Sequence, residues 1–393
     1  MTETNVEKIP AADNDLPDGV HFGLDEKIYH ALPRLSASGI TDLLVSPGTF
    51  WKNSWLDPDK CDDDTPARIL GRAYHTARLE PHKLDAQFVC ELDKGDFADG
   101  LVTDSAVKAK LKELEQTQSK SGETMLDRCW RLRDAGYTGP IYQIALDEWE
   151  EEKGDRTPIP AKYWRDIQVD MDRMRNSPEI AKLFTDGAAE VSLLWTCKQT
   201  GIRMKARIDY LKEKLIADLK TFQNTSRKRL DQCVADAFRY NRYYIQAAVY
   251  WDAVDLIRTG DLKIIGEATD AERAIIHGIQ TNLMPMESWY VFQEKEGVPN
   301  LIAYNIGLLN THASADAAEI GIDDKERLLR VRNALTHPSG ILMKARLEIH
   351  HAKSLMNTYS SVYEDGETWQ TVNPLRRLDD SNFNGYWLED TIT

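Results

Sequence analysis

The clearest pattern along the chain is an alternation of apolar and polar residues on both sides of a short polar turn. The runs Arg203–Leu211 and Leu215–Thr221 have the two-residue period of half-buried strands, and Lys212–Lys214 joins them. We therefore expect a β-hairpin here. A further strand, Ala188–Thr196, precedes it, and a second hairpin is expected at Ser288–Ile306.

Apolar residues at spacings of three and four predict helices on either side of these strands. In the first of them, Ser36 or Ser38 serves as the N-cap, and Pro47 follows the end of the helix. The predicted helices are 35–44, 67–80, 105–114, 123–135, 158–184, 232–257 and 323–363.

Composition divides the chain into four segments. Residues 1–20 lack periodicity and are predicted to form a flexible N-terminal tail. Residues 21–92 contain the first core helices, whereas 93–160 are polar and rich in Lys and Glu, which predicts a helical insertion. Residues 161–393 are expected to complete the core and to end in a helical region.

The net charge of −15 disfavours general binding to nucleic acid. The charge is uneven, however, because residues 201–250 carry eleven Lys and Arg against five Asp and Glu. The acidic surplus lies elsewhere, at 57–64, 148–152 and 364–390. We expect one basic channel on an otherwise acidic protein.

The cysteines and the hydropathy profile indicate a cytoplasmic protein. Five cysteines are scattered without a C-x-x-C pair, which fits a reducing compartment and argues against a zinc ribbon or a clustered iron–sulfur site. No run of eighteen apolar residues occurs, and the first residues are polar and acidic. We expect neither a membrane span nor a secretory signal.

Asp209, Asp218 and Lys220 form the candidate active site on the first hairpin. Strand periodicity places Asp218 and Lys220 on one face, and a tight turn brings Asp209 opposite Ala217 or Asp218. Two carboxylates this close repel each other unless a hard cation such as Mg²⁺ lies between them. Solvated cross-strand ion pairs are the alternative, but the apolar neighbours of Asp218 and Lys220 favour a buried catalytic or structural role.

The pattern D209…D218-x-K220 resembles the PD-(D/E)xK nuclease superfamily. Three stretches in the same order, LSASGITDLLVSPGTFW, LGRAYHTARLEP and YYIQAAVYWDAV, resemble phage RecE-type exonucleases (exonuclease VIII), relatives of lambda exonuclease and of RecB-like nuclease domains. This resemblance covers residues 25–390. It implies an α/β fold, in which a mixed central sheet is flanked by helices and carries a helical insertion.

The resemblance also implies a function. It indicates a metal-dependent exodeoxyribonuclease of a bacterial host cell that digests the 5′ strand of linear duplex DNA and leaves 3′ tails for recombination. It further implies a ring-shaped homo-oligomer, a trimer or tetramer, and a single-strand annealing protein as partner. Two alternatives remain: a non-catalytic DNA-end-binding phage protein on a decayed nuclease fold, and a PD-(D/E)xK endonuclease.

Site residues follow from the matched motifs. The predicted catalytic residues are Asp209, Asp218, Lys220, Gln246 and Tyr250, the last two from a Q-x-x-x-Y pattern. The predicted ligands of Mg²⁺, or alternatively Mn²⁺, are His75, Asp209, Asp218 and the carbonyl of Leu219, with Glu190 as an additional candidate. The predicted DNA contacts are Arg34, Ser36, Ser38, Arg72, Lys205, Arg207, Arg227 and Lys228.

Several of these residues also have ordinary structural explanations. Ser36 and Ser38 can cap a helix, and a helical histidine such as His75 is more often a core or surface residue. Gln246 and Tyr250 lie on a helical stripe that would usually face a core.

Overall fold

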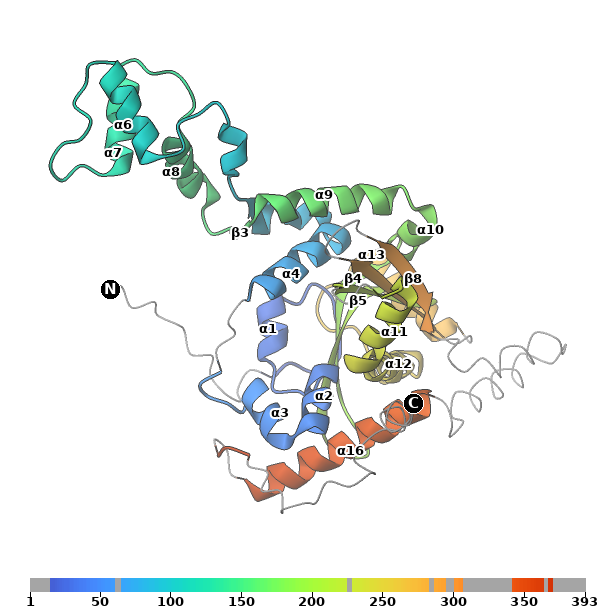
Figure 1. Ribbon diagram of the computed structural model, residues 1–393. Coiled ribbons are helices and arrows are strands. Elements are labelled where there is room, and N and C mark those ends of the chain that lie inside the picture. The colour runs from blue at the N-terminus through green and yellow to red at the C-terminus, as the bar shows by residue number, and fades with distance from the viewer. Residues whose placement is uncertain are drawn as a thin grey trace, which may run out of the picture.

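A six-stranded sheet forms the centre of the protein (Figure 1), in the order β1-β4-β5-β6-β7-β8. The computed structural model describes residues 15–60, 65–224, 228–282, 286–294, 300–306, 341–363 and 367–369. β6 and β7 pair in parallel and the other neighbours pair antiparallel, so the sheet is mixed. Its strands are β1 (Gly19–His21), β4 (Ala188–Thr196), β5 (Arg203–Leu211), β6 (Leu215–Phe222), β7 (Glu287–Glu294) and β8 (Leu301–Asn305).

These strands confirm the predicted α/β fold with a mixed sheet flanked by helices. The first hairpin is confirmed as β5 and β6, and the preceding strand as β4. The second hairpin corresponds to β7 and β8, which pair antiparallel, although its turn lies outside the described residues. The parallel pairing of β6 with β7 joins the two hairpins into one sheet.

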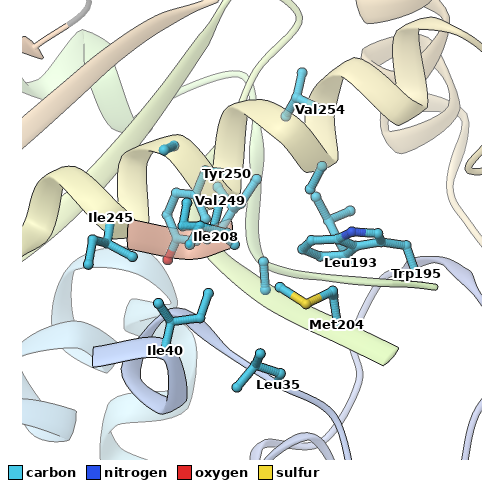
Figure 2. Close-up of a cluster of buried hydrophobic side chains, with 14 of the residues drawn as sticks. Leu35, Ile40, Leu193, Trp195, Met204, Ile208, Ile245, Val249, Tyr250 and Val254 are labelled. Carbon is cyan, nitrogen blue, oxygen red and sulfur yellow. The ribbon is translucent and has the colours of Figure 1, made fainter. Parts of the chain in front are cut away.

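One face of the sheet is covered by helices that share a large hydrophobic cluster with β4 and β5. In Figure 2, Val249 and Tyr250 of α12 (Tyr243–Arg258) lie beside Ile208 of β5. Burial of this apolar surface is the main force that holds the layer on the sheet. The helices are α2 (Ala37–Val45), α12 (Tyr243–Arg258), α13 (Asp270–Thr281) and α16 (Ile341–Val362).

The opposite face carries α4 (Pro66–Leu79), α9 (Ala161–Arg175) and α10 (Pro178–Ala181). Leu79 at the end of α4 packs against Leu219 of β6 in a second cluster. Thr65 caps α4 by accepting the amide of Arg68, and Pro66 occupies its first turn. These signals fix where α4 begins, and its packing against the sheet fixes which side chains face β6.

Three helices project from the body of the protein in Figure 1 and form a small core of their own. They are α6 (Asp104–Glu113), α7 (Met125–Asp134) and α8 (Tyr142–Lys153). The chain leaves the body after β2 (Phe88–Cys90) and returns at β3 (Thr157–Ile159), and these two strands pair in parallel. The helices predicted at 105–114 and 123–135 are confirmed, α8 was not predicted, and the division of the chain into domains stays a prediction.

Two predicted helices are wrong because each is interrupted. The helix predicted over 158–184 stops at Arg175, since Pro178 lacks an amide donor and disfavours helix at the residue before it. The helix predicted over 232–257 divides at Arg242, whose φ of +52° is left-handed. The remaining helices are α1 (Glu26–Ala31), α3 (Pro47–Asn53), α5 (Leu84–Gln87), α11 (Leu230–Tyr240), and the short 3₁₀ turns 81–83, 94–97 and 182–184.

The predictions for the two ends of the chain also differ from the structure. The tail predicted over 1–20 extends too far, because Gly19 and Val20 belong to β1, where Val20 is fully buried. Residues 1–14 lie outside the described part of the chain. Of the helix predicted over 323–363, only α16 falls within the described residues, and it is a single helix. Among the described helices, none is both long and apolar enough to cross a membrane.

Candidate active site

The two strands of the first hairpin separate where Asp209 is located. Their ladder covers the two positions next to the turn and ends with Tyr210 opposite Ala217. Continuing this register places Asp209 opposite Asp218, one of the two arrangements that the sequence predicted. Asp209 Oδ2 accepts the amide of Leu219 at 2.8 Å. The Asp209 carboxylate thus replaces a main-chain carbonyl as the acceptor for β6. The candidate site lies where β5 and β6 stop pairing.

Glu190 on β4 falls opposite Asp209, because the paired residues on either side are Ala189 with Tyr210 and Val191 with Ile208, although Glu190 and Asp209 are not themselves paired. Its φ of +54° is left-handed, which is uncommon outside glycine and costs about 1–2 kcal/mol. The alternation of β4 breaks at this point, because Ala188 and Val191 pack into the same hydrophobic cluster although they are three residues apart. The strained residue presents a carboxylate to Asp209, and such strain is typical of functional sites.

Arg207 holds Glu190 in this position. Its Nε donates to Glu190 Oε2 at 2.6 Å and its Nη1 donates to the carbonyl of Leu24 at 2.8 Å. The guanidinium also lies 5.6 Å from the ring centroid of Tyr29. The sequence predicted a DNA contact for Arg207. In the structure it is half-buried and orients a candidate metal ligand.

His75 on α4 completes a cluster of potential metal ligands. Its Nδ1 lies 3.7 Å from Asp209 Oδ2. One ligand atom each from His75, Glu190 and Asp209 lies within 4.8 Å of the others. Burial lowers the pKa of His75, which favours the neutral imidazole that binds metals.

The chemistry of this cluster fits a divalent cation. Burial, and then the charge of Asp209, raise the pKa of Glu190, and burial raises the pKa of Asp209. Crowded carboxylates of this kind are stabilised when a cation neutralises them, and carboxylate oxygens suit Mg²⁺ while an added imidazole suits Mn²⁺. The side chains present can therefore hold such an ion.

Asp218 lies outside this three-residue group, although the sequence predicted it as a metal ligand. It is fully buried on β6, and its Oδ2 lies 2.5 Å from the ammonium of Lys220. Burial, and then the charge of Asp209, raise its pKa to about 7 despite the neighbouring lysine. The structure therefore pairs Asp218 with Lys220 and pairs Asp209 with His75 and Glu190.

Aromatic rings surround the ammonium of Lys220. It lies 5.0 Å from the ring centroid of Tyr243 and 5.8 Å from that of Tyr290. Burial lowers the pKa of Lys220, but Asp218 and Asp209 outweigh that effect and raise it overall. Lys220 therefore stays protonated at neutral pH. The sequence analysis missed both tyrosines as neighbours of Lys220, because α12 and β7 meet β6 only in the tertiary structure.

Gln246 and Tyr250 connect α12 to the acidic side chains. Gln246 Nε2 lies 3.1 Å from Asp218 Oδ1 and 2.7 Å from the hydroxyl of Tyr250. That hydroxyl donates to the carbonyl of Arg207 at 2.6 Å. The Q-x-x-x-Y pattern thus joins a buried carboxylate to the strand that carries Asp209. Both residues belong to the site, and Tyr250 also belongs to the hydrophobic cluster of α12.

Lys205 is buried and engaged inside the protein, whereas the sequence predicted a DNA contact for it. Its ammonium donates to the carbonyls of Tyr29, His30 and Leu32 at 3.0, 3.0 and 2.9 Å. It is buried, and three donors are all that an ammonium has. Lys205 stabilises the C-terminal end of α1, where carbonyl groups lack partners within the helix.

Arg34 is also unavailable to a phosphate in this arrangement. Its side chain is 2% exposed, and its guanidinium contacts Asp15 and Asp18 at 2.7 Å. Ser36 caps α2 by accepting the amide of Gly39 at 3.2 Å, and it shares a hydrogen bond with the exposed Ser38. The capping explanation holds for Ser36, and a phosphate contact at either serine stays a prediction.

Arg72, Lys228 and Arg227 are the remaining predicted DNA contacts. Arg72 is half-buried on α4, one turn before His75. Lys228 is exposed and pairs with Asp236 at 2.7 Å. Arg227 lies outside the described residues. Their contacts with DNA stay predictions.

The sheet and the acidic residues on its separated hairpin form an α/β domain, and the segment that carries them is similar to a known family. Residues 156–266 match the family described as "PDDEXK-like domain of unknown function (DUF3799)". This stretch includes Glu190, Asp209, Asp218 and Lys220, whereas His75 precedes it. The central part of the candidate site therefore lies in the segment that is similar to this PDDEXK-like family.

Comparisons over the whole chain add little to this match. No curated protein matches the sequence. The chain is similar to a crystal structure from Eubacterium rectale described as a "putative exonuclease", at 14% sequence identity and a TM-score of 0.28. The similarity covers 62% of this chain and 87% of that one.

Proposed function

We propose that this protein is a metal-dependent exodeoxyribonuclease that digests the 5′ strand of linear duplex DNA. The observation that carries the proposal is the juxtaposition, at one opening in the sheet, of the cluster His75–Glu190–Asp209 and the pair Asp218–Lys220. A cation site beside a buried ammonium suits the hydrolysis of a phosphodiester, in which negative charge builds up on the phosphate oxygens.

The side chains of the site have separate tasks in this mechanism. His75, Glu190 and Asp209 would hold the cation, and Asp218 and the carbonyl of Leu219 are further predicted ligands. When bound, a divalent cation polarises the phosphate and offsets its charge. Arg207 orients Glu190, so that the ligands are in place before the substrate arrives.

Lys220 contributes a fixed positive charge next to the cation site. Because its ammonium stays protonated, it acts as a hydrogen-bond donor and not as a base. It orients the attacking water and stabilises the charge that develops on the phosphate. Asp218, which Gln246 in turn hydrogen-bonds, holds the lysine in place together with the ring of Tyr243.

The direction of digestion and the biological setting are supported by the resemblance of the sequence motifs to RecE-type exonucleases. On this basis we include the 5′ strand, the 3′ tails for recombination, a phage origin and a single-strand annealing partner in the proposal. A ring-shaped trimer or tetramer around the DNA belongs to it as well. Native mass spectrometry should then show a closed oligomer, and monomers alone, with and without DNA, would contradict the ring.

Digestion of a linear duplex tests the function directly. With Mg²⁺ or Mn²⁺, the protein should release nucleotides from a duplex labelled at one 5′ end and leave the opposite strand intact. A covalently closed circle should remain uncut, and excess chelator should stop the reaction. Comparing 5′-phosphate with 5′-hydroxyl ends tests whether an end phosphate is recognised.

The other outcomes of this experiment identify the alternatives. Cutting of the closed circle would indicate an endonuclease of the same superfamily. Binding to duplex ends without release of nucleotides, with either cation, would indicate a non-catalytic end-binding protein. Shortening of the labelled strand from its 3′ end, with the 5′ label kept on progressively shorter products, would overturn the proposed direction alone.

A further inference from the structure

The connection between α11 and α12 combines an unusual backbone with an exposed aromatic residue. α11 ends at Tyr240 and α12 begins at Tyr243, so only Asn241 and Arg242 lie between them. Arg242 has φ +52° and ψ +39°, a left-handed conformation that glycine or asparagine adopts more readily. The side-chain amide of Asn241 hydrogen-bonds to the hydroxyl of Tyr243 at 3.2 Å. This turn is therefore tied to the residue that contacts Lys220.

Tyr240 is 73% exposed, the highest value among the exposed large hydrophobic residues of the described chain. The guanidinium of the neighbouring Arg239 lies 5.9 Å from its ring centroid. Arg239 is itself exposed and has no carboxylate within ion-pairing distance among the described residues. An exposed ring with a guanidinium beside it can stack on a nucleotide base, because every base offers a flat π face.

The acidic residues near this turn already have partners. Asp231 pairs with Arg229 at 3.1 Å, and Asp236 pairs with Lys228 at 2.7 Å. Within the part of the chain that the structure describes, the ion pair of the Arg242 side chain is a long one, 3.9 Å to Glu348. The positive charge of the turn is therefore available to an anionic ligand such as a phosphate.

The position of the turn connects it to the candidate active site. Lys220 lies 5.0 Å from the ring centroid of Tyr243. Three peptide units separate Tyr240 from Tyr243, and they span at most about 11 Å. An extended strand advances by several ångströms for each nucleotide, so a strand that reaches Lys220 would pass Tyr240 within a few nucleotides.

We propose that Arg239, Tyr240 and Arg242 form a platform for one strand of nucleic acid, with an unpaired base stacked on Tyr240 and phosphates held by the two arginines. This inference rests on the proposed nuclease function and deepens it. It requires that the strand beside Lys220 is separated from its complement. The platform should therefore bind single strands without strong sequence preference.

The test measures binding in the presence of chelator, where cleavage cannot occur. The probe is a fluorescently labelled thymidine oligonucleotide, followed by anisotropy over a range of salt concentrations. Tyr240→Ser should weaken binding about tenfold, because a stacking contact is lost, whereas Tyr240→Phe keeps the ring and should restore most of the affinity. Arg239→Gln should reduce the slope of log affinity against log salt by about 0.7, the value for one phosphate contact on a single strand.

Arg175 offers a matched control. It is 68% exposed on α9 and pairs with Asp172, so Arg175→Gln removes a surface charge away from the turn. Affinity and salt slope of this variant should equal those of the wild type. A Tyr240→Ser protein that binds like the wild type, or Ser and Phe variants that lose equal affinity, would overturn the platform.

The result separates this inference from the proposed function. If the wild type binds the single strand through Tyr240 but digests no linear duplex, the proposed nuclease function is rejected and the platform is retained. If the wild type digests duplex ends and Tyr240→Ser binds the single strand normally, the platform is rejected and the nuclease function is retained.

Discussion

Replacing Lys220 by methionine is expected to lower the rate of DNA digestion by about a hundred- to a thousandfold while the protein still folds and binds divalent metal. Methionine has a similar length and no charge, so the variant loses the positive charge beside the phosphate. Asp218 then remains buried without its cation. Since its pKa is already raised to about 7, it should take up a proton instead of unfolding the protein.

The measurement is the release of nucleotides from an end-labelled linear duplex at saturating Mg²⁺, with Mn²⁺ titration of the same protein as the metal-binding control. Lys214→Met is the matched variant, because Lys214 lies in the turn of the same hairpin and its side chain is 70% exposed. It should digest DNA like the wild type. If Lys220→Met digested DNA within threefold of the wild-type rate, the proposed role of Lys220 would be rejected.

Asp209→Asn is expected to abolish metal binding and to raise the stability of the metal-free protein. Divalent metal should no longer stabilise the protein, and digestion should fall below detection, because Asp209 contributes an oxygen to the cluster with His75 and Glu190. Without metal, the variant should be more stable than the wild type at pH 8. Asparagine removes a charge that repels Glu190, and its carbonyl can still accept the amide of Leu219.

The pH dependence follows from the raised pKa of Asp209. A carboxyl whose pKa is higher in the folded than in the unfolded protein destabilises the fold when it is ionised, by about 1.4 kcal/mol for each unit of difference. The metal-free wild type should therefore lose stability as the pH rises through the folded pKa values of these acids, and the variant should lose less.

Thermal unfolding in chelator at pH 5 to 8 checks this expectation, and repeating it with Mn²⁺ shows the loss of metal stabilisation. Asp172→Asn on the exposed face of α9 is the control, with an expected melting temperature equal to that of the wild type. An Asp209→Asn protein that is less stable than the wild type at pH 8 without metal would show that the acids are not crowded as the structure indicates.

Local sequence signals predicted the elements that carry the acidic residues. Alternation of apolar and polar residues identified β5 and β6, although consecutive residues of both strands are buried in the structure. The polar positions of the alternation include Lys205, Asp209 and Asp218, which find their partners inside the protein. Cap residues located the start of α2. The break at Arg242 escaped prediction, because arginine is a good helix former and only the packing of α11 and α12 imposes a left-handed turn there.

Roles in the site were harder to predict than elements. The sequence identified Asp209, Asp218 and Lys220, but Lys205 and Arg207, which share a strand face with Asp209, were predicted to contact DNA. In the structure Lys205 meets three carbonyls and Arg207 meets Glu190. A charge in a sequence does not reveal its partner, because a partner 170 or more residues away, as for Lys205, is brought close only by folding.

The sequence by itself determined the hairpin, the alternation of its faces and the three charged residues embedded in apolar strands, because these depend on neighbours within a few positions. The tertiary structure alone decided which side chains lie together: His75 and Glu190 lie beside Asp209, and Lys220 lies beside Asp218. The physical reason is the separation of β5 from β6 beyond Tyr210. It admits the Asp209 carboxylate between the strands and brings side chains from α4, β4 and α12 to one point.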